Sequence, residues 1–247
     1  YEITTRLVGS EMCIRDRAPD NGWVTEGIVY TAGSDMVNED KTEAVFANDN
    51  TVKAFELWKE FYTEGCAAKG TDSELSQQFM AGNLAMHIQS TSMLSGFKSA
   101  SEAGDWELYG AAMPGLNGND AVPVNSGSCL AVRPDSEQKA QAIWEFIKYA
   151  TGNDGYTIIT SEIGYLPLRT ELADDPKYLK SYVDENPLLK INLEQLKEIR
   201  PVTIWPGDVA TEAFTIFRDA TVEAITTDAD VKEVLDKAQD DINQLLQ

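Results

Sequence analysis

The sequence predicts an α/β fold, and three observations indicate this class. Segments with apolar residues at helical spacing alternate with short apolar runs of the length of buried strands. The helical segments outnumber the strand-like runs. The composition, 43% hydrophobic and 25% charged, is that of a soluble globular protein. At 247 residues the chain is long enough for one large domain or two small ones.

The first 17 residues stand apart from the rest. Residues 8–17, VGSEMCIRDR, fit neither a helical nor a strand period and resemble translated sequencing-adapter read-through. We therefore expect a foreign leader at 1–17, a chain that properly enters near Ala18, and a gene truncated on its N-terminal side.

Helices are expected wherever apolar residues recur every three or four positions. The cleanest pattern is the last one, which begins near Asp230. The expected helical ranges are 51–65, 75–79, 93–97, 136–150, 156–161, 176–182, 189–199, 209–225 and 230–247.

Strands are expected at four apolar runs. The residues 125–128 interrupt the last of them with Asn, Ser and Gly, which favours a backbone crossing between two bodies or a close approach by a ligand. The two prolines in 200–207 predict an extended segment there. The expected strands are 27–32, 84–88, 108–113 and 123–132.

A polar elbow joins the expected strand 84–88 to the next helix. It contains Gln89, Ser90, Thr91 and Ser92, so hydroxyls and backbone N–H groups gather at a helix N-terminus beyond a strand. Ligands of open α/β sheets bind in that position. A Ser/Thr cap that closes an ordinary turn is the alternative.

The charge balance restricts the partners. With 20 basic and 41 acidic residues the formal charge is −21, which argues against binding to nucleic acid or to an anionic membrane surface. No run approaches the ~18 apolar residues of a membrane-spanning helix. Of three cysteines, Cys13 falls in the leader, and a Cys66–Cys129 bridge is one alternative to two small buried thiols.

The sequence contains no recognisable set of catalytic or metal-binding residues. The single histidine, His87, has no partner histidine for a metal and no G-x-S-x-G elbow accompanies it, so a structural role is favoured. No phosphate-binding glycine motif occurs. Most carboxylates fall on expected solvent-facing helix faces or in turns. We therefore expect no enzyme activity, no cofactor and no metal.

Aromatic residues in loop-like contexts offer a binding chemistry. A sugar ring stacks its C–H face on an aromatic plane, and its hydroxyls need polar partners around the rim. Trp23, Tyr165 and Trp205 each lie near Gly or Pro, away from any helical stripe. Each can equally be a loop anchor in the core. Trp58 and Trp144 lie on helical stripes and are assigned to packing.

The ordered motifs of the chain resemble one family. The helix 51–65 is followed by F-x-x-G-x-x-A-M at 79–86, GAAMPG at 110–115, NSGSCLAV at 125–132, the helix containing 142–149, and RPVTIWP at 200–206 before two final helices. This set is similar to the extracellular solute-binding proteins of ABC importers, in the carbohydrate-binding group that includes maltose-binding proteins.

The resemblance implies a two-lobed, type II periplasmic-binding-protein-like fold, here lacking most of the N-terminal lobe. Residues 18–122 would form the second, C-terminal lobe. Residues 123–175 would cross the hinge into the first lobe, and 176–247 would return to the second. Without the rest of the first lobe, 123–175 would lose packing partners and expose an apolar face.

The resemblance also implies a function: capture of a sugar or oligosaccharide between the lobes and its delivery to the permease subunits of an ABC transporter. The protein would be a monomer outside the cytoplasm, in the periplasm or anchored as a lipoprotein. A glycoside hydrolase with a carboxylate pair, or a binder of a polyol or glycerol phosphate, are the alternatives. The residues carried over by position as ligand-binding are Trp23, Ser90, Thr91, Ser92, Asn125, Ser126, Gly127, Tyr165 and Trp205.

Overall fold

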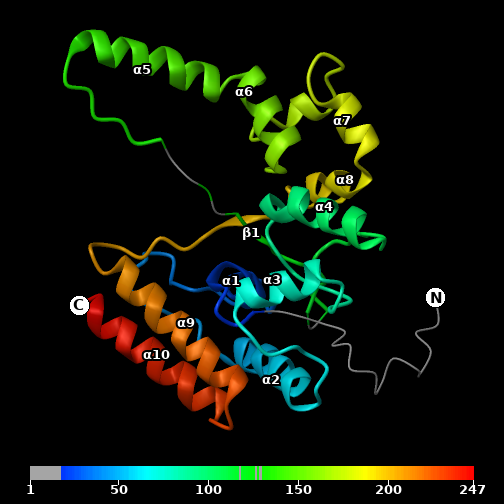
Figure 1. Cartoon of the computed structure of the whole chain (residues 1–247). Helices are drawn as coiled ribbons and strands as arrows, with labels where there is room; N and C mark the ends of the chain where they lie inside the picture. Colours follow the sequence, from blue (N-terminus) through cyan, green and yellow to red (C-terminus); the bar gives the residue numbers. More distant parts are fainter. Residues whose placement is uncertain (1–17, 117, 126, 128–129) are drawn as a thin grey trace. The chain divides into compact units, whose positions relative to one another are not determined.

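A computed structural model describes residues 18–116, 118–125, 127 and 130–247 (Figure 1). In this part of the chain helices predominate, and the named strands form one short parallel pair. The elements are α1 (Gly22–Thr31), α2 (Asp49–Thr63), α3 (Asp72–Met80), η1 (Thr91–Met93), α4 (Leu94–Gly104), β1 (Val124–Asn125), α5 (Glu137–Ala150), α6 (Asn153–Ile158), η2 (Ile159–Ile163), η3 (Thr170–Ala173), α7 (Lys180–Glu185), α8 (Pro187–Gln195), β2 (Arg200–Pro201), α9 (Ala210–Thr226) and α10 (Val231–Leu245).

The chain divides into two compact units, each built from separate segments. Unit 1 comprises Tyr1–Gln89, Met113–Ser126 and Glu198–Gln247, and unit 2 comprises Ser90–Ala112 and Gly127–Lys197. These boundaries are not those of the lobes expected from the resemblance, and the assignment of segments to lobes stays a prediction.

The main core lies in unit 1, where α9 and α10 pack on α1 and α2. Phe46 and Phe217 meet edge to face with their ring centroids 5.0 Å apart, and Trp58 on α2 is 2% exposed. Trp58 is therefore a packing residue, as the helical stripe predicts. β1 and β2 pair in parallel, with Val124 opposite Arg200.

The expected strand 27–32 is wrong, because residues 27–31 belong to α1 and Ala32 is its C-cap. Asn21 caps this helix with its side chain, and eight of the ten residues of α1 are buried. A helix that is covered on nearly all sides needs no polar face, so its sequence carries no helical period. The β-branched and aromatic residues Ile28, Val29 and Tyr30 then suggest a strand, and tertiary packing overrides that preference.

The apolar runs 84–88 and 108–113 form no named strand in the described part of the chain. Leu84 is buried, whereas Met86 is 41% exposed and Tyr109 is 78% exposed. A strand exists only through its ladder to a neighbour, and composition alone cannot supply that neighbour. The run 123–132 is confirmed as a strand only at Val124–Asn125.

The amphipathic helices are confirmed, most of them within about four residues of their expected bounds, although α4 continues to Gly104 where the sequence predicts an end at 97. Thr71 and Glu74 form a capping box at the start of α3, and Gly82 takes the left-handed conformation after its end, with φ 76°. Asp230 caps α10 by accepting the N–H of Glu233.

Unit 2 has a smaller core, in which Leu172, Leu179, Val183 and Leu189 are buried. Its longest helix, α5, contains no buried residue. Trp144 on α5 is 58% exposed, so its assignment to packing is wrong in this structure. The helix has the apolar stripe that its sequence predicts, but that stripe is not covered.

Candidate functional site

Trp23 lies near the start of α1 and not in a loop, contrary to the expectation. The Asn21 side chain accepts a hydrogen bond from the N–H of Val24 at 3.3 Å and so begins the helix just before Trp23. The Trp23 side chain is 47% exposed and can contact a ligand from unit 1.

A second aromatic ring, that of Phe214 on α9, lies against the first residue of α1. A Cβ atom placed on Gly22 would lie 2.5 Å from Cζ of Phe214, so any larger residue at this position would require the Phe214 ring to move. Phe214 is partly exposed. The sequence assigns it to the core stripe of α9, and its helical spacing gave no sign of a surface role.

A network of polar side chains surrounds the N-terminus of α1. Asp72 Oδ1 accepts hydrogen bonds from the side-chain amides of Asn21 and Gln89, each at 2.9 Å. Gln89 also donates to Ser76 Oγ at 3.1 Å, and Ser76 Oγ lies 3.0 Å from His87 Nε2. His87 thus belongs to a hydrogen-bonded network, consistent with the structural role favoured for it.

A buried carboxylate lies one turn further along α1. Glu26 is 3% exposed, and its Oε1 accepts hydrogen bonds from the Tyr30 hydroxyl at 2.8 Å and from Thr203 N and Oγ1 at 2.5 and 2.6 Å. Burial raises the pKa of Glu26, against the lowering effect of these hydrogen bonds, and burial raises the pKa of Tyr30 to about 12. Sequence reasoning missed this network, because nothing distinguishes Glu26 from the other acidic residues.

The other predicted residues of unit 1 lie around β1 and β2. Asn125 is exposed, and its carbonyl accepts the N–H of Val202 at 2.9 Å. Trp205 is 4% exposed and belongs to the main core, so its ring takes the alternative role of a core anchor. A ligand contact by either residue stays a prediction. Ser126 lies outside the described residues.

In unit 2 the structure brings Ser90, Thr91 and Ser92 of the polar elbow close to the segment that contains Tyr165. Ser90 Oγ accepts the N–H of Ser92 at 3.3 Å, as the cap alternative predicts. A Cβ atom on Gly164 would lie 2.9 Å from the Thr91 carbonyl oxygen, which places the neighbouring Tyr165, 44% exposed, beside this elbow.

Gly127, also predicted to bind ligand, is an exposed residue of unit 2. A Cβ atom placed on it would meet no other atom within 4 Å. Nothing in the described surroundings therefore requires a glycine at this position.

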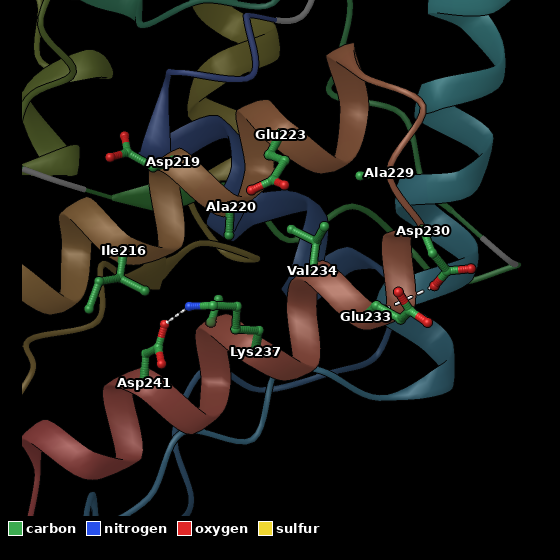
Figure 2. Close-up of a pocket in the computed structure, with 11 residues that line it drawn as sticks. Ile216, Asp219, Ala220, Glu223, Ala229, Asp230, Glu233, Val234, Lys237 and Asp241 are labelled. Carbon is green, nitrogen blue, oxygen red and sulfur yellow. Dashed lines mark hydrogen bonds and ion pairs between the residues drawn. The ribbon is translucent and has the colours of Figure 1, made fainter.

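A groove of about 490 Å³ runs between α9 and α10 (Figure 2). Carboxylates dominate its polar lining, and Lys237 is paired with Asp241. It contains no aromatic residue and none of the predicted site residues. Its lining residues are Ile216, Asp219, Ala220, Glu223, Ala229, Asp230, Glu233, Val234, Lys237, Ala238 and Asp241. Because a sugar site needs an aromatic plane, this groove is not the candidate site.

Three further properties concern the described residues as a set. They contain no cluster of His, Cys, Asp and Glu suited to hold a metal ion. None of their helices combines the length and the apolar character needed to cross a membrane. Cys66 is a free, exposed thiol, while Cys129 lies outside the described part of the chain.

The helix-rich α/β fold of the described residues matches the fold of solute-binding proteins. Residues 14–189 match the family model described as bacterial extracellular solute-binding protein. This match covers more than half of the chain, which therefore belongs to that family. No curated protein matches the chain significantly.

Solved structures of this fold resemble the chain at low sequence identity. UgpB from Mycobacterium tuberculosis, in complex with glycerophosphocholine, has a TM-score of 0.76 at 20% identity and covers 98% of this chain and 60% of its own. The GacH receptor of Streptomyces glaucescens gives 0.80 at 18%, covering 96% and 60%. MalE from Bdellovibrio bacteriovorus, bound to maltotriose, gives 0.77 at 16%, covering 96% and 60%. The chain thus spans about 60% of the length of these structures.

Proposed function

We propose that this chain is part of the extracytoplasmic substrate-binding component of an ABC importer, which captures a sugar or oligosaccharide and delivers it to the membrane permease. The protein acts by binding, without chemical change of its ligand. A lipid-anchored or periplasmic monomer is the form we expect. The location outside the cytoplasm follows from the extracellular family to which the chain belongs.

The observation that carries this proposal is the setting of Trp23. Its side chain is 47% exposed, and Asn21, two residues before it, donates its side-chain amide to Asp72, so an open apolar plane and fixed polar side chains occur at the same end of α1. A sugar needs this combination, because its ring has apolar C–H faces and a rim of hydroxyls. Ser90, Thr91, Ser92, Asn125, Ser126, Gly127, Tyr165 and Trp205 remain predicted ligand contacts.

The enzyme alternative has less support. A glycoside hydrolase needs two carboxylates about 5–10 Å apart in one cleft, with at least one free to meet substrate. The groove between α9 and α10 contains several carboxylates but no aromatic residue on which a sugar ring could stack, and Thr203 and Tyr30 occupy Oε1 of the buried Glu26. The Glu26 carboxylate therefore accepts hydrogen bonds from the protein itself, including the backbone N–H of Thr203.

The experiment is thermal unfolding with a panel of solutes, done on this chain and on a version extended at its N-terminus to the length of the solved relatives. The panel contains maltotriose, other oligosaccharides, polyols and glycerophosphocholine. A ligand that binds the native state raises the melting temperature as its concentration rises. A shift with sugars and no product supports the proposal. A shift with glycerophosphocholine alone would favour a phosphodiester solute, and turnover would contradict the binding role.

A further inference from the structure

The Glu26 carboxylate gathers three donors onto one oxygen atom. Two of them, the N–H and the hydroxyl of Thr203, come from a residue 177 positions away in the sequence, and the third is the Tyr30 hydroxyl one helical turn along α1. The Tyr30 and Thr203 hydroxyls also lie 2.8 Å apart. The three residues thus form a closed set of contacts between α1 and the segment after β2.

This set fixes the segment 200–205 at its middle, and further contacts fix its two ends. At one end the Arg200 guanidinium lies 3.8 Å from the centroid of the Tyr30 ring and pairs with Asp35 at 2.8 Å. At the other end Trp205 is buried in the main core. The whole segment is therefore held against α1, the helix that carries Trp23.

A buried carboxylate is an expensive way to hold a segment that apolar packing could hold. Removing a charge from water carries a penalty, and good hydrogen bonds only offset it. Charge-assisted hydrogen bonds are short and strong, so the carboxylate fixes the position and orientation of Thr203 relative to α1. Glu26 also lies three residues from Trp23 on α1, so the two side chains are neighbours on that helix. A contact that fixes this orientation is suited to a ligand-binding surface, where the relative positions of side chains determine affinity.

We propose that Glu26 is a positioning residue for ligand binding, which locks the segment 200–205 to α1 and so keeps the surface around Trp23 in its binding geometry. This inference rests on the proposed function. Glu26 itself does not touch the ligand. Its effect is transmitted through Thr203, and the charged groups next to this contact are Arg200 and Asp35.

A plain stabilising role is the competing interpretation, and Thr221 provides the matched control. Thr221 is fully buried on α9 in the same unit, and its hydroxyl donates to the Phe217 carbonyl at 2.9 Å. Thr221→Ala removes a buried hydrogen bond from the core without touching the Glu26 contact. It therefore reports what a general loss of stability does to ligand affinity.

The first test uses fluorine NMR of this chain labelled with 5-fluorotryptophan, each resonance being assigned by a Trp→Phe variant. Glu26→Ala should shift or broaden the Trp205 resonance and leave that of Trp58 in place. Glu26→Gln keeps an acceptor oxygen, so its Trp205 resonance should remain at the position found in the unmodified chain. Thr203→Val, which removes one donor, should shift Trp205 if Glu26→Ala does not fold. An unmoved Trp205 resonance in the folded Glu26 and Thr203 variants would overturn the inference.

The second test measures affinity for maltotriose in the version extended to the relatives' length. Glu26→Ala should weaken binding by about tenfold or more, Glu26→Gln by less than about threefold, and Thr221→Ala not at all. Equal affinities of Glu26→Ala and Thr221→Ala would leave Glu26 with a stabilising role only and overturn the inference. If no solute of the panel binds the unmodified protein, the proposed function fails, and the inference fails with it even where the Trp205 resonance moves.

Discussion

Trp23 and Glu26 lie three residues apart on α1, and their side chains differ in exposure to solvent. The tryptophan leaves about half of its surface open, although it is apolar, and the glutamate is 3% exposed, although it is ionisable. The buried carboxylate runs against the usual placement of acidic residues, and such exceptions are expected at functional sites.

Replacing Trp23 with alanine should abolish the sugar-dependent rise in melting temperature while leaving the unliganded melting temperature within a few degrees. The ring is half-exposed, so its loss removes little core packing but removes the stacking surface. Leu57→Ala, at a large apolar residue 39% exposed on α2 of the same unit, is the control and should leave the sugar response unchanged. Retained affinity in the Trp23 variant would exclude it from the site.

The stability of unit 1 should depend on pH through Glu26. Burial raises the pKa of Glu26 above its ordinary value of 4.5, so the folded protein binds this proton more tightly than the unfolded chain. The stability that protonation contributes is then fully present below pH 4.5 and is lost as the pH rises through the folded pKa. Relative to Glu26→Gln, the wild-type free energy of unfolding should fall across that window, as measured by urea unfolding at a series of pH values. A constant difference would contradict the raised pKa.

At this scale the sequence names Trp23 as a ligand contact, and that role stays a prediction. The loop setting expected for Trp23 is wrong, because Asn21 begins α1 just before it. Glu26 and Thr203 were missed, because their contact joins positions 177 residues apart and neither residue type is rare. Trp205 was placed correctly only as one of two alternatives, since proline and glycine neighbours are equally typical of exposed loops and of buried anchors.

Among the elements, the approach of α9 to the start of α1 depends on a missing side chain. Gly22→Ala should destabilise the protein by about 1–3 kcal/mol, because the new Cβ would lie 2.5 Å from the Phe214 ring and force it away. Gly96→Ala on α4 is the control: a Cβ there meets nothing within 4 Å, so alanine should stabilise that helix by about 0.5–1 kcal/mol. Native-state hydrogen exchange of the two helices measures both effects. Equal signs would contradict the packing explanation.

Element prediction succeeded where one helix face meets water. The helices α2, α9 and α10 each bury a stripe and expose the opposite face, so their period is visible in the sequence. It failed for α1, which is buried on most sides, and for the runs 84–88 and 108–113, whose apolar character suggested strands. A helix period needs a polar face, and a strand needs a partner. Tertiary packing determines both the burial of a helix and the pairing of a strand, so neither can be read from the local sequence.

At the scale of the whole molecule, unit 2 exposes more large apolar side chains than a soluble surface usually does. On α5, Trp144, Phe146 and Tyr149 are each more than half exposed. Leu168, which lies outside α5, is 73% exposed. Because the chain spans about 60% of the solved relatives, we predict that the remaining length covers this surface.

This chain alone should therefore self-associate and bind a hydrophobic dye, and the version extended to the relatives' length should do neither. Light scattering after gel filtration and dye fluorescence measure the two effects. Glu substitutions at Trp144 and Phe146 should suppress the association of this chain, whereas Glu at the exposed Leu57 of α2 should not. A chain that stays monomeric without the extension would show that α5 needs no cover.

The order in which unit 1 is assembled has a consequence for timing. Its core joins Phe46 to Phe217, and α10 completes it within a few residues of the C-terminus. During synthesis the segments that precede α9 therefore keep their apolar residues uncovered until α9 and α10 have been made, and such distant pairings form slowly.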